Sequence, residues 1–196
     1  MADNDKGLII CISGPSVAGK GTVLGRVQER FPQMGNSISV TTRAPRGTEQ
    51  DGVEYYFRSK EQFEQMIEDG EIIEYDTYVG NYYGTPKTHL QEVTDSGSDC
   101  LLDLTVAGSV ALKNIFVDQA LIIFLMPPSM EVLEERLRNR KTESEEKIAM
   151  RLSQAADEMK RKDEFDHIVV NDDLDTAVNE VISLIETKKN NYKKEV

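Results

Sequence analysis

The sequence predicts an α/β fold in which a parallel sheet is covered by helices on both faces. Three observations lead to this prediction: short apolar runs typical of buried strands, longer segments with apolar residues at helical spacing, and the alternation of the two along most of the chain. The chain has 196 residues, of which 39% are hydrophobic, and this is enough for one folded domain with a sizeable core.

Four apolar runs, bounded by glycine, proline or polar residues, are predicted as buried parallel strands. In chain order they are 7–13, 100–104, 120–126 and 167–170. The first precedes a glycine-rich turn, and Pro127 and Pro128 end the third. Because helical patterns separate these runs, the strands are expected to be joined by crossover helices.

The first helix is predicted from Val23 to Phe31, where Pro32 stops the apolar spacing. Further helices are predicted over 106–116, 129–140, 148–159 and 174–185. A capping box of Thr142 and Glu145 is expected before the fourth of these five helices. The lysine-bearing tail, 188–194, is expected to be a frayed helix end.

Two stretches interrupt the alternation and are predicted as inserts in a single domain. Residues 37–97 contain short alternating segments and several glycines, which indicates an α+β insert. The charged, helical stretch at 129–164 is predicted to be a lid region. The core is then formed by 1–36, 98–128 and 165–196.

The formal net charge of −12 argues against general binding to nucleic acids or anionic membranes, because both need a basic face. No apolar run reaches about 18 residues, and the first six residues are too polar for a signal peptide. A cytoplasmic protein is therefore expected. Cys11 and Cys100 lie in apolar runs and are predicted to be buried core thiols.

The turn after the first strand has the pattern G-x-x-x-x-G-K between a strand and a helix, which predicts a loop that binds nucleotide phosphates. Its residues are Gly14, Pro15, Ser16, Val17, Ala18, Gly19, Lys20, Gly21 and Thr22. Backbone N–H groups would cradle the phosphates, and Lys20 would lie on the β and γ phosphates. Gly21 occupies the place of the Ser or Thr that usually binds Mg²⁺, and the hydroxyl comes one place later at Thr22. This ending resembles adenylate and cytidylate kinases more than GTPases.

Arg43 and Arg46 lie three residues apart in a proline-containing turn and could hold one phosphate by bidentate hydrogen bonds. Tyr55, Glu74 and the segment 80–85, Gly-Asn-Tyr-Tyr-Gly-Thr, follow. Taken together, these residues and their spacing resemble the GMP-binding region of guanylate kinases. The resemblance extends over nearly the whole chain, from about residue 8 to residue 185.

The resemblance implies a role for each residue of this region. The GMP phosphate would be held by Arg43, Arg46, Tyr55 and Tyr83. Ser39 and Thr85 would contact guanine O6, and Glu74 would accept from guanine N1 and N2. Chemistry supports the last role independently, since guanine presents two adjacent N–H donors and a carboxylate offers two acceptors in one plane.

The sequence departs from the family pattern at the end of the second predicted strand. Asp103 keeps the first of two aspartates usual in the family, whereas Thr105 replaces the second, which helps to bind guanine. Ala107 replaces a glutamine. Asp103 and Thr22 are the expected partners of an Mg²⁺ ion shared with ATP, directly or through water.

The resemblance also assigns Arg136, Arg140 and Arg151 to the lid, where they would neutralise charge on the transferring phosphoryl group. These arginines are expected to lie apart from the phosphate loop until both nucleotides bind. Asn171, which follows the last strand, would form part of the adenine pocket.

The sequence thus predicts a kinase that moves the γ-phosphoryl group of ATP to GMP with Mg²⁺. Lys20, Arg43 and the three lid arginines would carry the catalysis. Two alternatives stay open: a monophosphate kinase for another base, favoured by Thr105, and a non-catalytic binding module related to guanylate kinases. The intact Lys20 and the arginine set argue against the second alternative.

Overall fold

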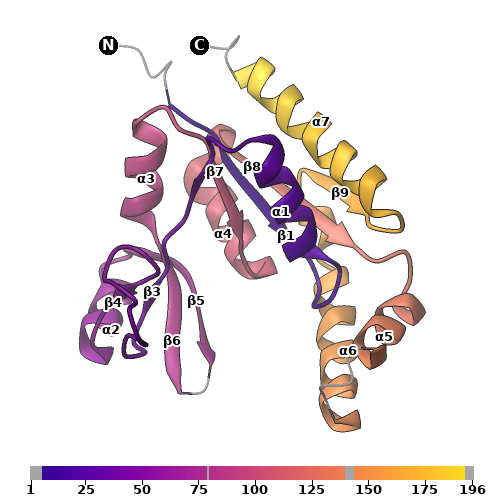
Figure 1. The fold of residues 1–196 in the computed structure, drawn as a ribbon, viewed down its shortest axis with the longest axis horizontal. Helices are drawn as coiled ribbons and strands as arrows, with labels where there is room; N and C mark the ends of the chain where they lie inside the picture. The colour runs from indigo at the N-terminus through magenta and orange to yellow at the C-terminus, as the bar shows by residue number, and fades with distance from the viewer. Residues whose placement is uncertain (1–5, 79, 140–143, 193–196) are drawn as a thin grey trace.

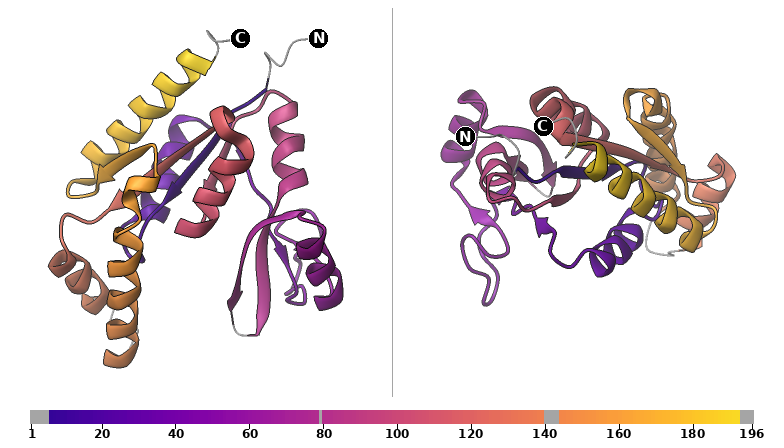
Figure 2. Two further views of the ribbon diagram at one scale, coloured as in Figure 1. Left: turned by 180° about the vertical axis from the view of Figure 1, so that it is seen from behind. Right: turned by 90° about the horizontal axis from the view of Figure 1, so that it is seen from above.

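The computed structural model describes residues 6–78, 80–139 and 144–192. Figure 1 shows a central sheet with two arms that extend from the same end of it, one containing β3 to β6 and the other α5 and α6. The start of β1 and the end of α7 lie at the opposite end of the sheet (Figures 1 and 2). The arms therefore flank the edge at which the central strands end.

The central sheet has five strands in the order β2-β7-β1-β8-β9, and every neighbouring pair is parallel. These strands are β1 (Ile9–Ser13), β2 (Gly35–Asn36), β7 (Cys100–Asp103), β8 (Ala120–Met126) and β9 (His167–Val170). The four predicted strands are confirmed, two of them with identical bounds. β2 is an additional edge strand of two residues, too short to produce an apolar run in the sequence.

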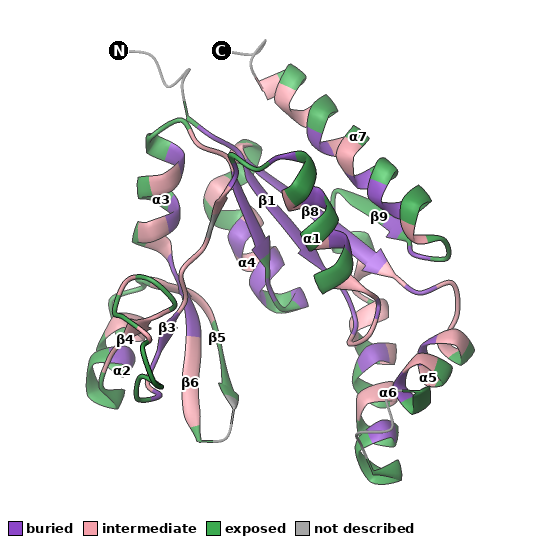
Figure 3. Ribbon diagram, viewed as in Figure 1, coloured by how far each residue is buried: buried purple, intermediate pink, exposed green. Residues whose placement is uncertain are grey.

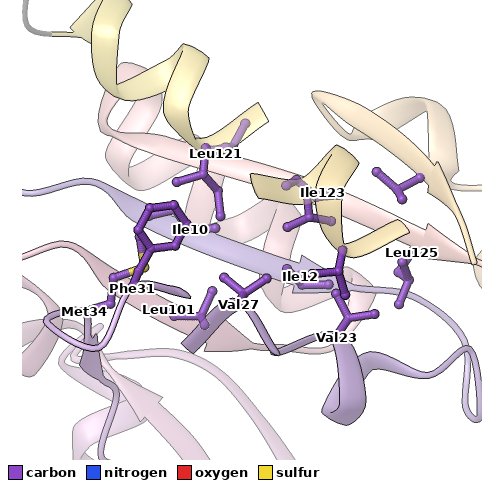
Figure 4. Close-up of a cluster of buried hydrophobic side chains, with 14 of the residues drawn as sticks. Ile10, Ile12, Val23, Val27, Phe31, Met34, Leu101, Leu121, Ile123 and Leu125 are labelled. Carbon is purple, nitrogen blue, oxygen red and sulfur yellow. The ribbon is translucent and has the colours of Figure 1, made fainter. Parts of the chain in front are cut away.

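Helices cover both faces of this sheet, as predicted. One face carries α1 (Lys20–Arg30) and α7 (Leu174–Tyr192), and the other carries α3 (Lys87–Asp95) and α4 (Val106–Phe116). Alternate residues of each central strand enter the two cores, so that Ile10 faces α1 and α7 while Cys11 faces α4. Figure 4 shows the first of these cores, and Figure 3 shows that the central strands are the most thoroughly buried part of the fold.

Cys11 and Cys100 are both buried in the second core, which confirms their packing role. Burial raises the pKa of each thiol to about 12, so both remain protonated at neutral pH.

The α+β insert contains a separate sheet with the strand order β4-β3-β6-β5. Its elements are β3 (Val40–Thr41), β4 (Tyr56–Phe57), α2 (Lys60–Glu68), β5 (Ile72–Tyr78) and β6 (Asn81–Pro86). β5 and β6 form an antiparallel hairpin, and Ser59 and Gln62 form a capping box at the start of α2. The helix α3 follows β6 directly and packs through Leu90 on the central sheet, so it connects the insert to the core.

The lid region consists of α5 (Met130–Asn139) and α6 (Glu145–Met159), which pack on each other through Leu133, Leu137, Ile148 and Ala155. The expected capping box is wrong. Ser144 is the N-cap and accepts from the N–H of Lys147, so Glu145 is the first helical residue rather than the third. Thr142 lies outside the described residues.

Two 3₁₀ helices, Val117–Gln119 and Lys162–Glu164, complete the described elements. Within the described ranges, no helix is both long enough and apolar enough to cross a membrane.

Candidate functional site

The predicted phosphate loop (residues 14–22) follows β1 and includes the first turn of α1, which begins at Lys20. This arrangement of strand, loop and helix is the one that the sequence predicts. Gly14 has a φ of +143°, and a Cβ atom there would lie 2.0 Å from the carbonyl oxygen of Leu125. Only glycine therefore fits between the loop and β8. Lys20 begins α1 and folds back over the loop, donating from Nζ to the carbonyl oxygen of Gly14 at 2.8 Å.

Asn171 holds this loop from the end of β9. Its Nδ2 donates to the carbonyl oxygen of Ala18 at 2.7 Å, and its side chain is buried. The same amide lies where a Cβ of Gly19 would be, since that atom would be 2.3 Å from Nδ2. Gly19 also has a φ of +97°, so the contact and the backbone both require glycine. The structure thus places Asn171 against the loop backbone.

Two of the arginines that the sequence assigns to a lid contact the loop and the residue that holds it. Arg151 of α6 donates from Nη1 to Oγ of Ser16 at 2.7 Å, and Arg136 of α5 donates from Nη2 to the carbonyl oxygen of Asn171 at 2.9 Å. Arg151 thus contacts the loop directly, and Arg136 contacts it through Asn171. The helix pair α5–α6 packs against the loop, since Val17 lies against its apolar cluster. Arg140 lies outside the described residues.

Glu158, also on α6, is a titratable group near the loop that the sequence did not indicate. Burial raises the pKa of its carboxyl group, and the charge of Lys20 acts in the opposite direction. In the sequence, Glu158 looks like any solvent-exposed glutamate of a charged helix. Only the tertiary structure shows that it lies near Lys20.

The arginine turn of the insert is organised around Glu49, which sequence reasoning missed. Arg43 donates to both oxygens of the Glu49 carboxylate, at 2.9 and 3.0 Å, and the backbone N–H of Arg46 donates to the same group. The Arg43 guanidinium also lies 5.4 Å from the ring centroid of Tyr55, which meets Tyr83 edge to face. Hydrogen bonding with Glu49 raises the pKa of Arg43 and lowers that of Glu49. Arg43 is buried, whereas Arg46 is exposed.

Glu74, on β5, projects onto the start of α4. Its Oε1 accepts from the hydroxyl of Thr85 at 3.2 Å, and its Oε2 accepts from the hydroxyl of Thr105 at 2.7 Å. Thr105 is the N-cap of α4 and accepts from the N–H of Gly108 at 3.0 Å. A Cβ on Gly108 would lie 2.4 Å from Cγ of Glu74, so the glycine leaves room for this carboxylate.

Each of the two threonines that donate to Glu74 lines a cavity. The first, of about 380 Å³, is lined by Ser39, Thr85 and Asp103 together with residues of α1. The second, of about 750 Å³, is bounded by β5, by Thr105 at the start of α4, and by α6. Glu74 thus joins a residue of the first cavity to a residue of the second.

Asp103 ends β7 and pairs in register with Ile12 of β1, so it lies at the strand edge from which the phosphate loop leaves. Burial raises the pKa of its carboxyl group; Lys20 opposes this effect and the charge of Glu74 adds to it. Thr22 lies in the first turn of α1 and is exposed. Asp103 therefore ends one strand and Thr22 lies in the helix that follows its neighbour.

The structure brings most of the expected residues into three groups. The loop is contacted by Asn171, Arg136 and Arg151. The carboxylate of Glu74 gathers Thr85 and Thr105. The third group surrounds Arg43, and Arg46 joins it through its backbone N–H, which donates to Glu49.

Comparison with known proteins gives one consistent result. The family model described as Guanylate kinase matches residues 6–188. A guanylate kinase of Chlorobium luteolum is 48% identical over 179 residues, covering 91% of this chain and 91% of the relative. A guanylate kinase of Desulfitobacterium hafniense is 42% identical, covering 95% of this chain and 93% of the relative. The crystal structure of guanylate kinase from Anaplasma phagocytophilum aligns with a TM-score of 0.68 at 31% identity, covering 94% of this chain and 87% of that one.

Proposed function

The chain belongs to the guanylate kinase family and is an enzyme that transfers a phosphoryl group from ATP to GMP, and from this premise we propose which residues perform the reaction. One observation carries the assignment. The phosphate loop follows β1, and the Glu74 site adjoins α4, which follows β7; β1 and β7 are neighbouring parallel strands. Ligands of α/β sheets bind at this edge, so the two nucleotides would meet there.

ATP binds with its phosphates in the loop 14–22, whose backbone N–H groups and Lys20 offset their charge. Lys20 reaches the phosphates from its contact with the carbonyl oxygen of Gly14. Asn171 keeps the loop in place through Ala18, and thereby orders the surface against which ATP lies.

GMP binds on the insert with its base at Glu74. Each carboxylate oxygen can accept two hydrogen bonds. Oε1 accepts from the Thr85 hydroxyl, and Oε2 accepts from the Thr105 hydroxyl and, at 3.4 Å, from the Thr105 N–H. When GMP binds, the Thr85 hydroxyl turns to donate to O6 beside Ser39, Oε1 accepts from guanine N1–H, and guanine N2–H replaces the long contact of the Thr105 N–H at Oε2. The GMP phosphate is held by Arg43, Arg46, Tyr55 and Tyr83, with Glu49 fixing the orientation of the Arg43 guanidinium.

The residues at the sheet edge fit a magnesium ion that arrives with ATP, since Asp103 and Thr22 supply the oxygen donors that this ion prefers. When bound, Mg²⁺ neutralises charge on the β and γ phosphates. Lys20, Arg43, Arg136, Arg140 and Arg151 supply the remaining positive charge. The acceptor phosphate is ionised at neutral pH, so transfer needs in-line positioning rather than a strong general base.

A coupled assay of ADP release by the pure protein, with GMP, AMP, CMP and UMP as acceptors, tests this proposal. GMP should be the preferred acceptor. Preference for another base would favour the other-base kinase, and the absence of turnover with all four would favour a binding module. ATP and GMP are intracellular metabolites, so we propose a cytoplasmic location for the enzyme.

A further inference from the structure

The hydroxyl of Thr105 is committed to one orientation. It donates its single proton to Oε2 of Glu74 at 2.7 Å and accepts from the N–H of Gly108 at 3.0 Å. The Thr105 backbone is fixed as well, because its carbonyl oxygen accepts from both the N–H and the Oγ of Ser109. Thr105 is therefore a rigid donor to the carboxylate that faces the base.

Because of this contact, the loss of one N–H donor from the base need not leave an oxygen of Glu74 without a hydrogen-bond partner. A site rejects an analogue strongly when the missing group leaves a buried polar atom without a partner. Here Oε2 keeps the Thr105 hydroxyl whatever base is bound, and Oε1 accepts from N1–H of a 6-oxopurine when the Thr85 hydroxyl turns to O6. A purine without the 2-amino group therefore leaves no oxygen of Glu74 unpaired.

We infer that Thr105 makes the 2-amino group of guanine dispensable, so that the enzyme also phosphorylates 6-oxopurine monophosphates that lack it, such as inosine monophosphate (IMP). Hypoxanthine keeps the N1–H that Glu74 accepts and the O6 that Ser39 and Thr85 contact. This inference rests on the proposed base site. The transfer is the same: the bond from the ATP γ phosphorus to its bridging oxygen breaks with the electron pair staying on ADP, and a bond forms from that phosphorus to an IMP phosphate oxygen, giving ADP and IDP.

The test compares kcat/KM for GMP, IMP and AMP in the wild-type enzyme and in three variants. In the wild type, GMP should exceed IMP by about ten- to a hundredfold, the worth of one charge-assisted hydrogen bond. AMP should be poor throughout, because its N1 presents a lone pair to Glu74. A GMP-to-IMP ratio above about a thousandfold in the wild type would overturn the inference.

Thr105→Asp is the decisive variant, because aspartate can still cap α4 but no longer donates to Glu74. Its GMP-to-IMP ratio should rise at least about tenfold, since two facing carboxylates need the protons of the 2-amino group. Thr105→Val, which loses the cap as well, should raise the ratio in the same direction. Thr105→Ser keeps the hydroxyl and should keep the wild-type ratio.

The ratio within one protein cancels any general loss of folding or turnover. Thr77→Val, the same change at an exposed threonine of β5, is the matched control and should leave the ratio unchanged. Titrations of GMP and IMP with a non-hydrolysable ATP analogue should give the same ordering of affinities. An unchanged ratio in Thr105→Asp would refute the role of Thr105, whereas the absence of GMP turnover in the wild type would refute the proposed function itself.

Discussion

Arg151 on α6 and Ser16 in the phosphate loop are joined by a hydrogen bond of 2.7 Å between Nη1 and Oγ. The guanidinium thus lies at the phosphate loop. An arginine held in this position needs little rearrangement to meet charge that develops on a transferring phosphoryl group.

We expect Arg151→Ala to lower kcat by about a hundredfold or more, in the range found when a charged group that stabilises the transition state is removed. Ser16→Ala removes the hydrogen bond but keeps the charge, and should cost less than about tenfold. Steady-state kinetics at saturating ATP and GMP would separate the two. Equal losses in both variants would show that Arg151 acts on the loop rather than on the phosphates.

Lys20→Ala should fold normally and lose most activity. The side chain donates to the loop carbonyl oxygens of Gly14 and Pro15, and alanine is a good helix former at the start of α1. Loss of the phosphate-bound charge should reduce kcat more than about tenfold. Thermal unfolding should be close to that of the wild type, and Lys147→Ala, at an exposed lysine of α6, serves as the control. A variant that retains more than a tenth of wild-type kcat would contradict the role of Lys20.

The central sheet and the phosphate loop were predictable because their signals are local. Strands β1 and β8 are buried along almost their whole length, so their sequences form continuous apolar runs, and the loop has its own glycine and lysine spacing. The two-residue strand β2 has no such run and is defined by pairing with β7. Glu49, Glu158 and the contact between Arg151 and Ser16 could not be predicted for the same reason, since each depends on where the insert or the lid packs.

The Arg43–Glu49 pair predicts a pH dependence of stability. Arg43 lowers the pKa of Glu49 below its ordinary value of 4.5. Between the pKa of Glu49 in the folded state and that in the unfolded state, the unfolded state binds more protons. The contribution of the ion pair to the free energy of unfolding is therefore complete above pH 4.5 and is lost as the pH falls through the lowered pKa. In urea unfolding, Glu49→Gln should have a lower free energy of unfolding than the wild type at pH 7, and this difference should become smaller at acidic pH. Glu68→Gln, at an exposed glutamate of α2, is the control. If the difference in the free energy of unfolding stays constant with pH, the Arg43–Glu49 charge pair is not its cause.

Nucleotide binding should compact the molecule through the insert. Arg136 and Arg151 lie at or beside the loop, so we expect the arm that carries Arg43 and Glu74 to make the larger movement (Figure 1). A bisubstrate analogue contacts both arms and favours the state in which they approach. Small-angle scattering should show a smaller radius of gyration with the analogue than with ATP analogue alone. The same radius in both samples would mean that the insert does not close.

Glu74→Gln tests base recognition most directly. Glutamine has the same shape, so it fits beside Gly108, but its amide nitrogen is a donor where the site supplies donors. Either a threonine hydroxyl or a guanine N–H then loses its acceptor. We expect KM for GMP to rise about ten- to a hundredfold, the loss of one charge-assisted hydrogen bond, and the preference for GMP over AMP to fall. Glu71→Gln, just before β5, controls for the change of charge on the insert. If Glu74→Gln keeps the full preference for GMP, the base is read elsewhere and the assignment of Glu74 is wrong.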